Sequence, residues 1–147
     1  MNRVLVLIHL AAVIVWIGGM FFANVCLRPV AAAQLQAPQR LQLLAAVLGR
    51  FFAVVGWALV LLWGSGLIRF AQVGAAIPWN WFSMIGNAAV MTVIFGLIVF
   101  RFHRRMIAGV ASQDWPAAGA AMNAIRQLVL ANLVLGFVTV AIAVLGS

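Results

Sequence analysis

Residues 4–27, VLVLIHLAAVIVWIGGMFFANVCL, form an uninterrupted apolar run without a formal charge, between Arg3 and Arg28-Pro29. A transmembrane helix needs roughly 17–25 apolar residues to cross the hydrocarbon core. The apolar core of a cleaved signal peptide is shorter, about 7–15 residues. We therefore expect residues 4–27 to form the first of the transmembrane helices and to end at Arg28-Pro29.

Three further runs without a formal charge follow, at about residues 51–68, 79–100 and 128–145. The chain of 147 residues is 67% hydrophobic and 7% charged, whereas about 25% of the residues in a soluble domain are charged. The strands of a membrane barrel would alternate apolar and polar residues, but these runs are apolar on every face. The sequence predicts an all-α integral membrane protein, a four-transmembrane-helix bundle that forms a single domain over residues 1–147.

The nine basic residues give a net charge of +8, but too little polar sequence remains for a nucleic-acid-binding face. Short cytoplasmic loops collect arginine. The remainder of the chain holds only two arginines, whereas the first and third loops together hold seven: Arg28, Arg40, Arg50, Arg101, Arg104, Arg105 and Arg126. We expect a multi-pass protein of a bacterial inner membrane with both termini periplasmic. The lipid bilayer is its expected partner, and a homo-oligomer or a larger membrane complex is left open.

Local signals place several helix ends. Leucines after Pro38 recur at helical spacing, so the second helix should begin before its span. Asp114-Trp115-Pro116 is typical of a helix N-cap followed by proline in the first turn, which predicts a fourth helix from Trp115. The loop at residues 70–78 should be periplasmic, with Trp79 and Trp81 in an interfacial aromatic belt.

His9 is the one strongly ionisable side chain inside a predicted span. Such a group is costly in hydrocarbon and indicates a function, although it could also make only a structural hydrogen bond. Met84 and Asn87, and also Ser65, are expected near its depth, and Trp16 could form a wall. Imidazole and thioether together suit Cu(I), so we expect His9 and Met84 to be metal ligands, with Asn87 and Trp16 beside the bound cofactor. His9 could instead be an axial ligand of haem b.

The second histidine, His103, lies among three arginines and is expected on a solvated basic face at the cytoplasmic end. It should be separated from His9 by about the 30 Å hydrocarbon core, so the two histidines cannot ligate one metal within a subunit. A path of His9, Met91, Met20 and Cys26 could carry copper across, although methionine is also an ordinary packing residue.

Several catalytic patterns are absent from the sequence. It has no CxxC, HExxH, P-loop or dinucleotide fingerprint. Asp114 is the only acidic residue, so paired-carboxylate catalysis is excluded. We expect a protein without enzymatic activity; an enzyme of this composition would be a haem-dependent oxidoreductase.

Short motifs along most of the chain resemble the CopD-type copper-resistance membrane proteins. They are the opening helix with His9, Trp16 and Gly18-Gly19, then Arg50-Phe51-Phe52, residues 63–66, residues 114–118, Arg126 and residues 132–136. The resemblance implies a small inner-membrane four-helix protein for copper uptake, transfer or tolerance, with His9, Trp16 and Gly18-Gly19 as matched positions.

The HemJ-type protoporphyrinogen oxidases are similar in size and helix number, and also open with histidine followed by Trp-Gly. This second resemblance implies a haem-b redox protein, either an electron carrier or an oxidase. That family carries a lysine at the start of the third helix, where this chain has Phe82-Ser83-Met84 and no lysine anywhere. A third reading is a small structural subunit of a membrane complex, with a structural His9.

Overall fold

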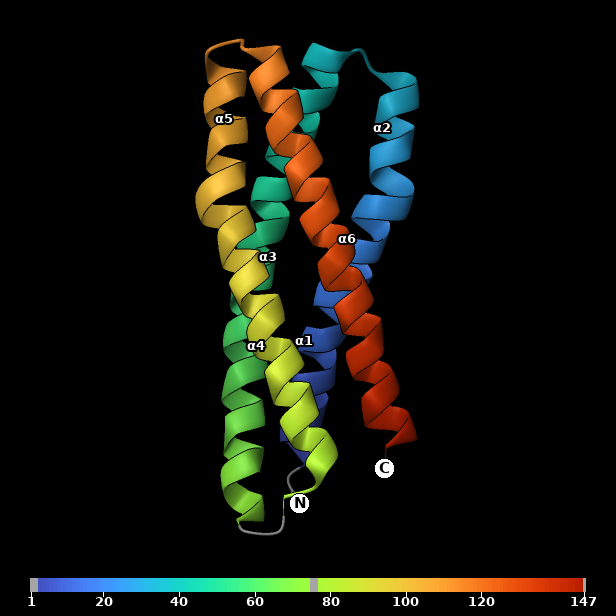
Figure 1. Cartoon of the computed structure of the whole chain (residues 1–147), viewed down its shortest axis with the longest axis vertical. Helices are drawn as coiled ribbons and strands as arrows, with labels where there is room; N and C mark the ends of the chain where they lie inside the picture. Colours follow the sequence, from blue (N-terminus) through green and yellow to red (C-terminus); the bar gives the residue numbers. More distant parts are fainter. Residues whose placement is uncertain (1–2, 75–76, 147) are drawn as a thin grey trace.

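Four long helical stretches account for nearly all of the computed structural model, which describes residues 3–74 and 77–146. They are Arg3–Gln34, Ala37–Val73, Trp79–Ala111 and Trp115–Leu145, and each is long and apolar enough to cross a membrane. No strand occurs in these described ranges. The predicted all-α architecture with four membrane-length helices is confirmed, and Figure 1 shows the stretches running side by side.

The first and third stretches each contain a wider π-helical segment. Helices α1 (Arg3–Phe21) and α2 (Arg28–Gln34) are joined by η1 (Phe22–Leu27), and α4 (Trp79–Leu97) and α5 (Arg104–Ala111) are joined by η2 (Ile98–His103). The helical stretch therefore continues past Arg28-Pro29, where the predicted span ends. A proline ring clashes with the carbonyl four residues earlier in an ordinary α-helix, and the wider η1 turn provides room there.

The other two helices begin and end at identifiable signals. Helix α3 (Ala37–Val73) has proline in its first turn and stops at Gly74, whose positive φ of 71° suits glycine. It begins before the predicted span, as expected, and also extends into the predicted loop at residues 70–78, of which 75 and 76 lie outside the described residues. Helix α6 (Trp115–Leu145) begins after Asp114, whose carboxylate accepts the Ala117 N–H at 3.3 Å. The predicted N-cap is confirmed.

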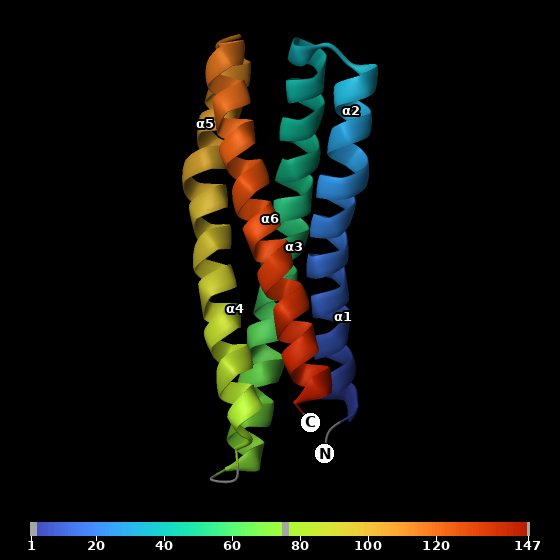
Figure 2. The ribbon, with the colours of Figure 1, turned by 45° about the vertical axis from the view of Figure 1, so that its right-hand side comes forward.

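The helices pack most extensively as two pairs, α1 with α3 and α4 with α6. Glycine allows close approach in the first pair, because the ring of Phe51 occupies the place of a Cβ at Gly19. The pairs are joined by an aromatic cluster in which the Phe95 ring contacts Trp16 and Phe52 edge-on, at centroid distances of 6.4 and 5.9 Å. Both chain ends lie at one end of the bundle, opposite α2 and α5 (Figures 1 and 2).

Candidate functional site

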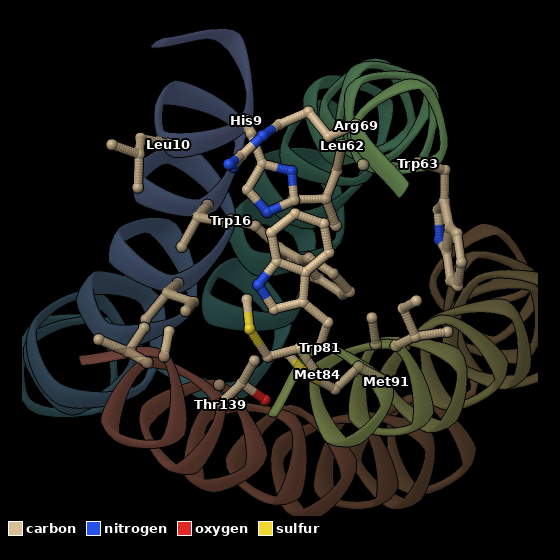
Figure 3. Close-up of a pocket in the computed structure, with 18 of the residues that line it drawn as sticks. His9, Leu10, Trp16, Leu62, Trp63, Arg69, Trp81, Met84, Met91 and Thr139 are labelled. Atoms are coloured by element: carbon tan, nitrogen blue, oxygen red, sulfur yellow. The ribbon is translucent and has the colours of Figure 1, made fainter. Parts of the chain in front are cut away.

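A cavity of about 390 Å³ lies between the two helix pairs, in the half of the bundle that holds the chain ends. Helices α1, α3, α4 and α6 all contribute to its walls, which are mainly apolar and aromatic. Figure 3 shows how the side chains of His9, Trp16, Arg69, Trp81 and Met84 lie around this space. Its size lies in the range of small-molecule and cofactor sites, about 300–1,000 Å³.

His9 is fixed to α3 by a short chain of hydrogen bonds. The Ser65 hydroxyl donates to the carbonyl of Leu62, one turn earlier, with an oxygen–oxygen distance of 3.2 Å. The same Oγ lies 3.3 Å from Nδ1 of His9. A hydroxyl has a single hydrogen, so Oγ accepts here and His9 Nδ1–H donates. This arrangement assigns the lone pair of the neutral imidazole to Nε2, the nitrogen that can bind a metal or a haem iron.

Gly66, the residue after Ser65, lies beside the imidazole of His9. A Cβ built at this position would lie 3.5 Å from Cε1 and 3.7 Å from Nδ1 of His9. These are ordinary van der Waals distances, so an alanine at this position would also fit beside the ring. The hydrogen bond to Ser65 is therefore the contact that orients His9 on α3.

Helix α4 provides the soft groups of the cavity, whereas the cationic group, Arg69, comes from α3 and lies beside His9. Met84 and Met91 of α4 both line the cavity. Arg69 of α3 lies over the ring of Trp81, with its guanidinium carbon 5.1 Å from the ring centroid, so this cation–π pair bridges α3 and α4. Behind Met91, the amide of Asn132 donates to the Met91 carbonyl at 3.1 Å and connects α6 to α4.

The structure brings most of the predicted site residues together. His9, Trp16 and Met84 line the same cavity, and Ser65 contacts His9 directly. Asn87 is not part of the cavity lining. It lies three residues from Met84 on α4 and is half-buried, so its role beside a bound cofactor stays a prediction.

Sequence reasoning missed Arg69, Trp81 and Asn132. The sequence argument uses Arg69 only for orientation and Trp81 only for the interfacial belt, which stays a prediction; the structure places both side chains on the cavity. Trp79, by contrast, is exposed, as a belt residue would be. Asn132 could have been found, because an amide in the middle of the fourth apolar run needs an internal partner.

The expectation that His103 lies on a solvated basic face is wrong. Its side chain is buried, with 6% exposure, and Nε2–H donates to the carbonyl of Ala45 at 3.1 Å. Arg101, Arg104 and Arg105 are exposed, so the helix directs the arginines outward and His103 inward. The Phe52 ring meets the imidazole edge-on, at a centroid distance of 5.0 Å.

The two histidines are nevertheless far apart, as predicted. His9 contacts Ser65 and His103 contacts Ala45, both on α3. These two residues are twenty positions apart, and twenty residues of α-helix span about 30 Å. Of the residues on the conjectured copper path, Met20 and Met91 are buried and Cys26 is exposed, and the path itself stays a prediction. Within the described ranges, no three of His, Cys, Asp and Glu gather as a metal site. A metal ion in the cavity would therefore rest on His9 and thioethers.

The fold and cavity define a class: a bundle of four membrane-length helices with a histidine-containing internal cavity. No protein-family model, curated protein or solved structure matches the chain.

Proposed function

We propose that this protein binds Cu(I) in the cavity through His9 and Met84 and serves copper uptake, transfer or tolerance. The main support is the hydrogen bonding of His9, which uses Nδ1 and leaves the Nε2 lone pair for a metal. Met84 supplies a soft thioether on the same cavity, and Met91 offers a second one. This donor set suits Cu(I) better than Mg²⁺ or Ca²⁺, which prefer oxygen ligands.

The chemistry of the site favours transfer of the ion over permanent retention. A structural zinc site typically has four closed protein ligands, whereas this cavity offers one imidazole and neutral thioethers. The ligands carry no negative charge, so a monovalent soft ion can be accepted and released. The resemblance to the CopD-type proteins supports the same assignment.

A second candidate function, binding of haem b, is favoured by one specific observation. The cavity of about 390 Å³ is much larger than a metal ion requires, and its walls are apolar and aromatic. His9 would provide the axial nitrogen, and Arg69 would place a positive charge at the cavity wall. A bound haem would supply one-electron chemistry; the protein's own contribution would be to orient it and to exclude water.

Copper and haem can be distinguished with purified protein. We would express it with added copper and with a haem precursor, and record copper content, iron content and the visible spectrum for the wild type, His9→Ala and His103→Gln. His103→Gln is the matched control, because it removes a histidine outside the cavity and retains a donor for Ala45. The proposal predicts about one copper per chain, lost only in His9→Ala. A Soret band that is lost only in His9→Ala would establish haem instead. If His9→Ala changes neither the copper content nor the Soret band, binding of copper and of haem through His9 are both excluded.

We also propose that the chain is a multi-pass protein of a bacterial inner membrane with both termini in the periplasm. Seven arginines belong to the half of the bundle with α2 and α5, while Arg3 and Arg69 belong to the half with the chain ends. Alkaline phosphatase fused to the C-terminus should be active, since that enzyme requires the periplasm. Activity only when the fusion is placed between α5 and α6 would reverse the assigned orientation.

A further inference from the structure

A second, much smaller cavity lies in the opposite half of the bundle, where η1, α2, α3 and α6 meet. Its volume is about 20 Å³. Asn24, Arg28 and Arg126 line it together with apolar side chains of α3 and α6, such as Leu44 and Ile125. Two cationic side chains from different helices therefore share one cleft.

Two buried donor atoms at this cleft lack an internal acceptor. The Asn24 Nδ2 and Arg28 Nε atoms are buried, and neither has a hydrogen-bond partner within the described part of the chain. Arg126 is held by its own helix, since Nη2 donates to Asn123 Oδ1 at 2.9 Å. Buried donors are normally paired, so these atoms indicate an acceptor that comes from outside the chain.

The chain cannot neutralise the two arginines internally. Asp114 is its only acidic residue, and it caps α6 twelve residues before Arg126, about 18 Å away along the helix. Forked guanidinium donors match the oxygens of a phosphate. The missing acceptor is thus best explained as a phosphate-type anion.

We propose that Asn24, Arg28 and Arg126 bind a phosphate group, supplied by the headgroup of an anionic phospholipid. Arg28 directly follows the apolar run at residues 4–27, and Arg126 comes two residues before the run at 128–145, so both lie where a predicted span meets the headgroups. The small cavity is about the size of one water molecule, so one phosphate oxygen can enter while the rest of the headgroup stays outside.

The surface around the cleft suits a lipid. The residues next in sequence to two lining residues, Val25 in η1 and Leu130 in α6, are exposed, at 53% and 52%, so apolar side chains on both helices are available to acyl chains. Basic pockets between transmembrane helices bind anionic headgroups in this way. A lipid at this position would join α6 to the first helical stretch independently of what the larger cavity binds.

The test uses the full chain in nanodiscs that contain equal amounts of phosphatidylglycerol and phosphatidylcholine. Lipids retained after gentle detergent release are counted by native mass spectrometry. The wild type should retain phosphatidylglycerol preferentially, and Arg28→Gln and Arg126→Gln should each lower this preference about fivefold. Arg104→Gln is the matched control, because it removes the same charge from an exposed side chain of the same half and should change the ratio less than twofold.

Two further measurements make the outcome decisive. Unfolding measured in pure phosphatidylcholine nanodiscs shows which variants fold. If an arginine variant does not fold, Asn24→Ala replaces it, because it removes the unpaired amide and keeps both charges. Asn24→Ala should also lower the preference for phosphatidylglycerol. Adding inorganic phosphate, with chloride at equal ionic strength as the comparison, tests whether the free ion binds. If phosphate stabilises the protein but phosphatidylglycerol is not preferred, the site binds phosphate and the lipid is rejected as its source. Equal retention of both lipids without a phosphate effect would overturn the proposal, and so would an equal loss in Arg104→Gln.

Discussion

At the scale of single residues, Ser65 determines what His9 can do. Its hydroxyl hydrogen points to Leu62, so its oxygen accepts from His9 Nδ1–H and leaves Nε2 as the ligand atom. Partners of this kind fix the orientation and tautomer of metal-binding histidines. The functional proposal therefore depends on a residue that does not touch the ligand.

Ser65→Ala should weaken Cu(I) binding without abolishing it. Loss of the acceptor frees the imidazole to rotate and to change tautomer, and second-shell changes of this kind typically reduce metal affinity about 10–100-fold. Competition with a Cu(I) chelator measures the affinity. Ser112→Ala is the matched control, because Ser112 also donates to a carbonyl of its own helix but is exposed and distant from the cavity. Equal affinities of Ser65→Ala and the wild type would contradict the role assigned to Ser65.

His103 is predicted to be structural. His103→Leu removes the hydrogen bond to Ala45 and should lower the free energy of unfolding by about 1 kcal/mol, as measured by detergent titration. His103→Gln retains a donor and should recover part of the loss. Neither variant should change copper binding, and a loss of copper in a folded His103→Gln protein would show that this histidine belongs to the metal site.

At the scale of elements, the apolar runs predicted four helices but not their full lengths or rotations. Hydropathy identifies which residues can lie in lipid, whereas helices continue as long as their backbone hydrogen bonds are satisfied. Both π segments allow a stretch to pass a point where the sequence suggested an end. Because the runs are apolar on every face, they do not determine which side chains face inward. The expectation for His103 is wrong for this reason, while Ser65, which is expected only near the depth of His9, contacts it directly.

Two adjacent glycines test the packing of α1 on α3. A Cβ at Gly19 meets the Phe51 ring, whereas a Cβ at Gly18 meets nothing within 4 Å. Gly19→Ala should destabilise the protein by roughly 1–3 kcal/mol, the usual cost of overpacking. Gly18→Ala should be neutral or stabilising by up to about 1 kcal/mol, because alanine favours the helix. Detergent unfolding of both variants checks the contrast; equal stabilities would mean that Phe51 does not pack on Gly19.

At the scale of the whole molecule, the two halves of the bundle differ in chemistry. The half with the chain ends contains the large cavity with His9 and Met84, and the other half contains seven of the nine arginines. Arg28 and Arg126 line the small cavity in that second half. The proposed copper site and the proposed phosphate site therefore lie in opposite halves of the bundle.

X-ray absorption at the copper edge tests the central claim most directly. The protein would be loaded with one equivalent of Cu(I) in a Cys26→Ser background, because that exposed thiol could bind copper by itself. The account predicts one imidazole nitrogen and at least one thioether sulfur around the metal. His9→Ala should remove the nitrogen, Met84→Leu should reduce the sulfur signal, and Met106→Leu, a buried methionine outside the cavity, should change neither. A copper environment that is the same in His9→Ala as in the parent protein would contradict the account.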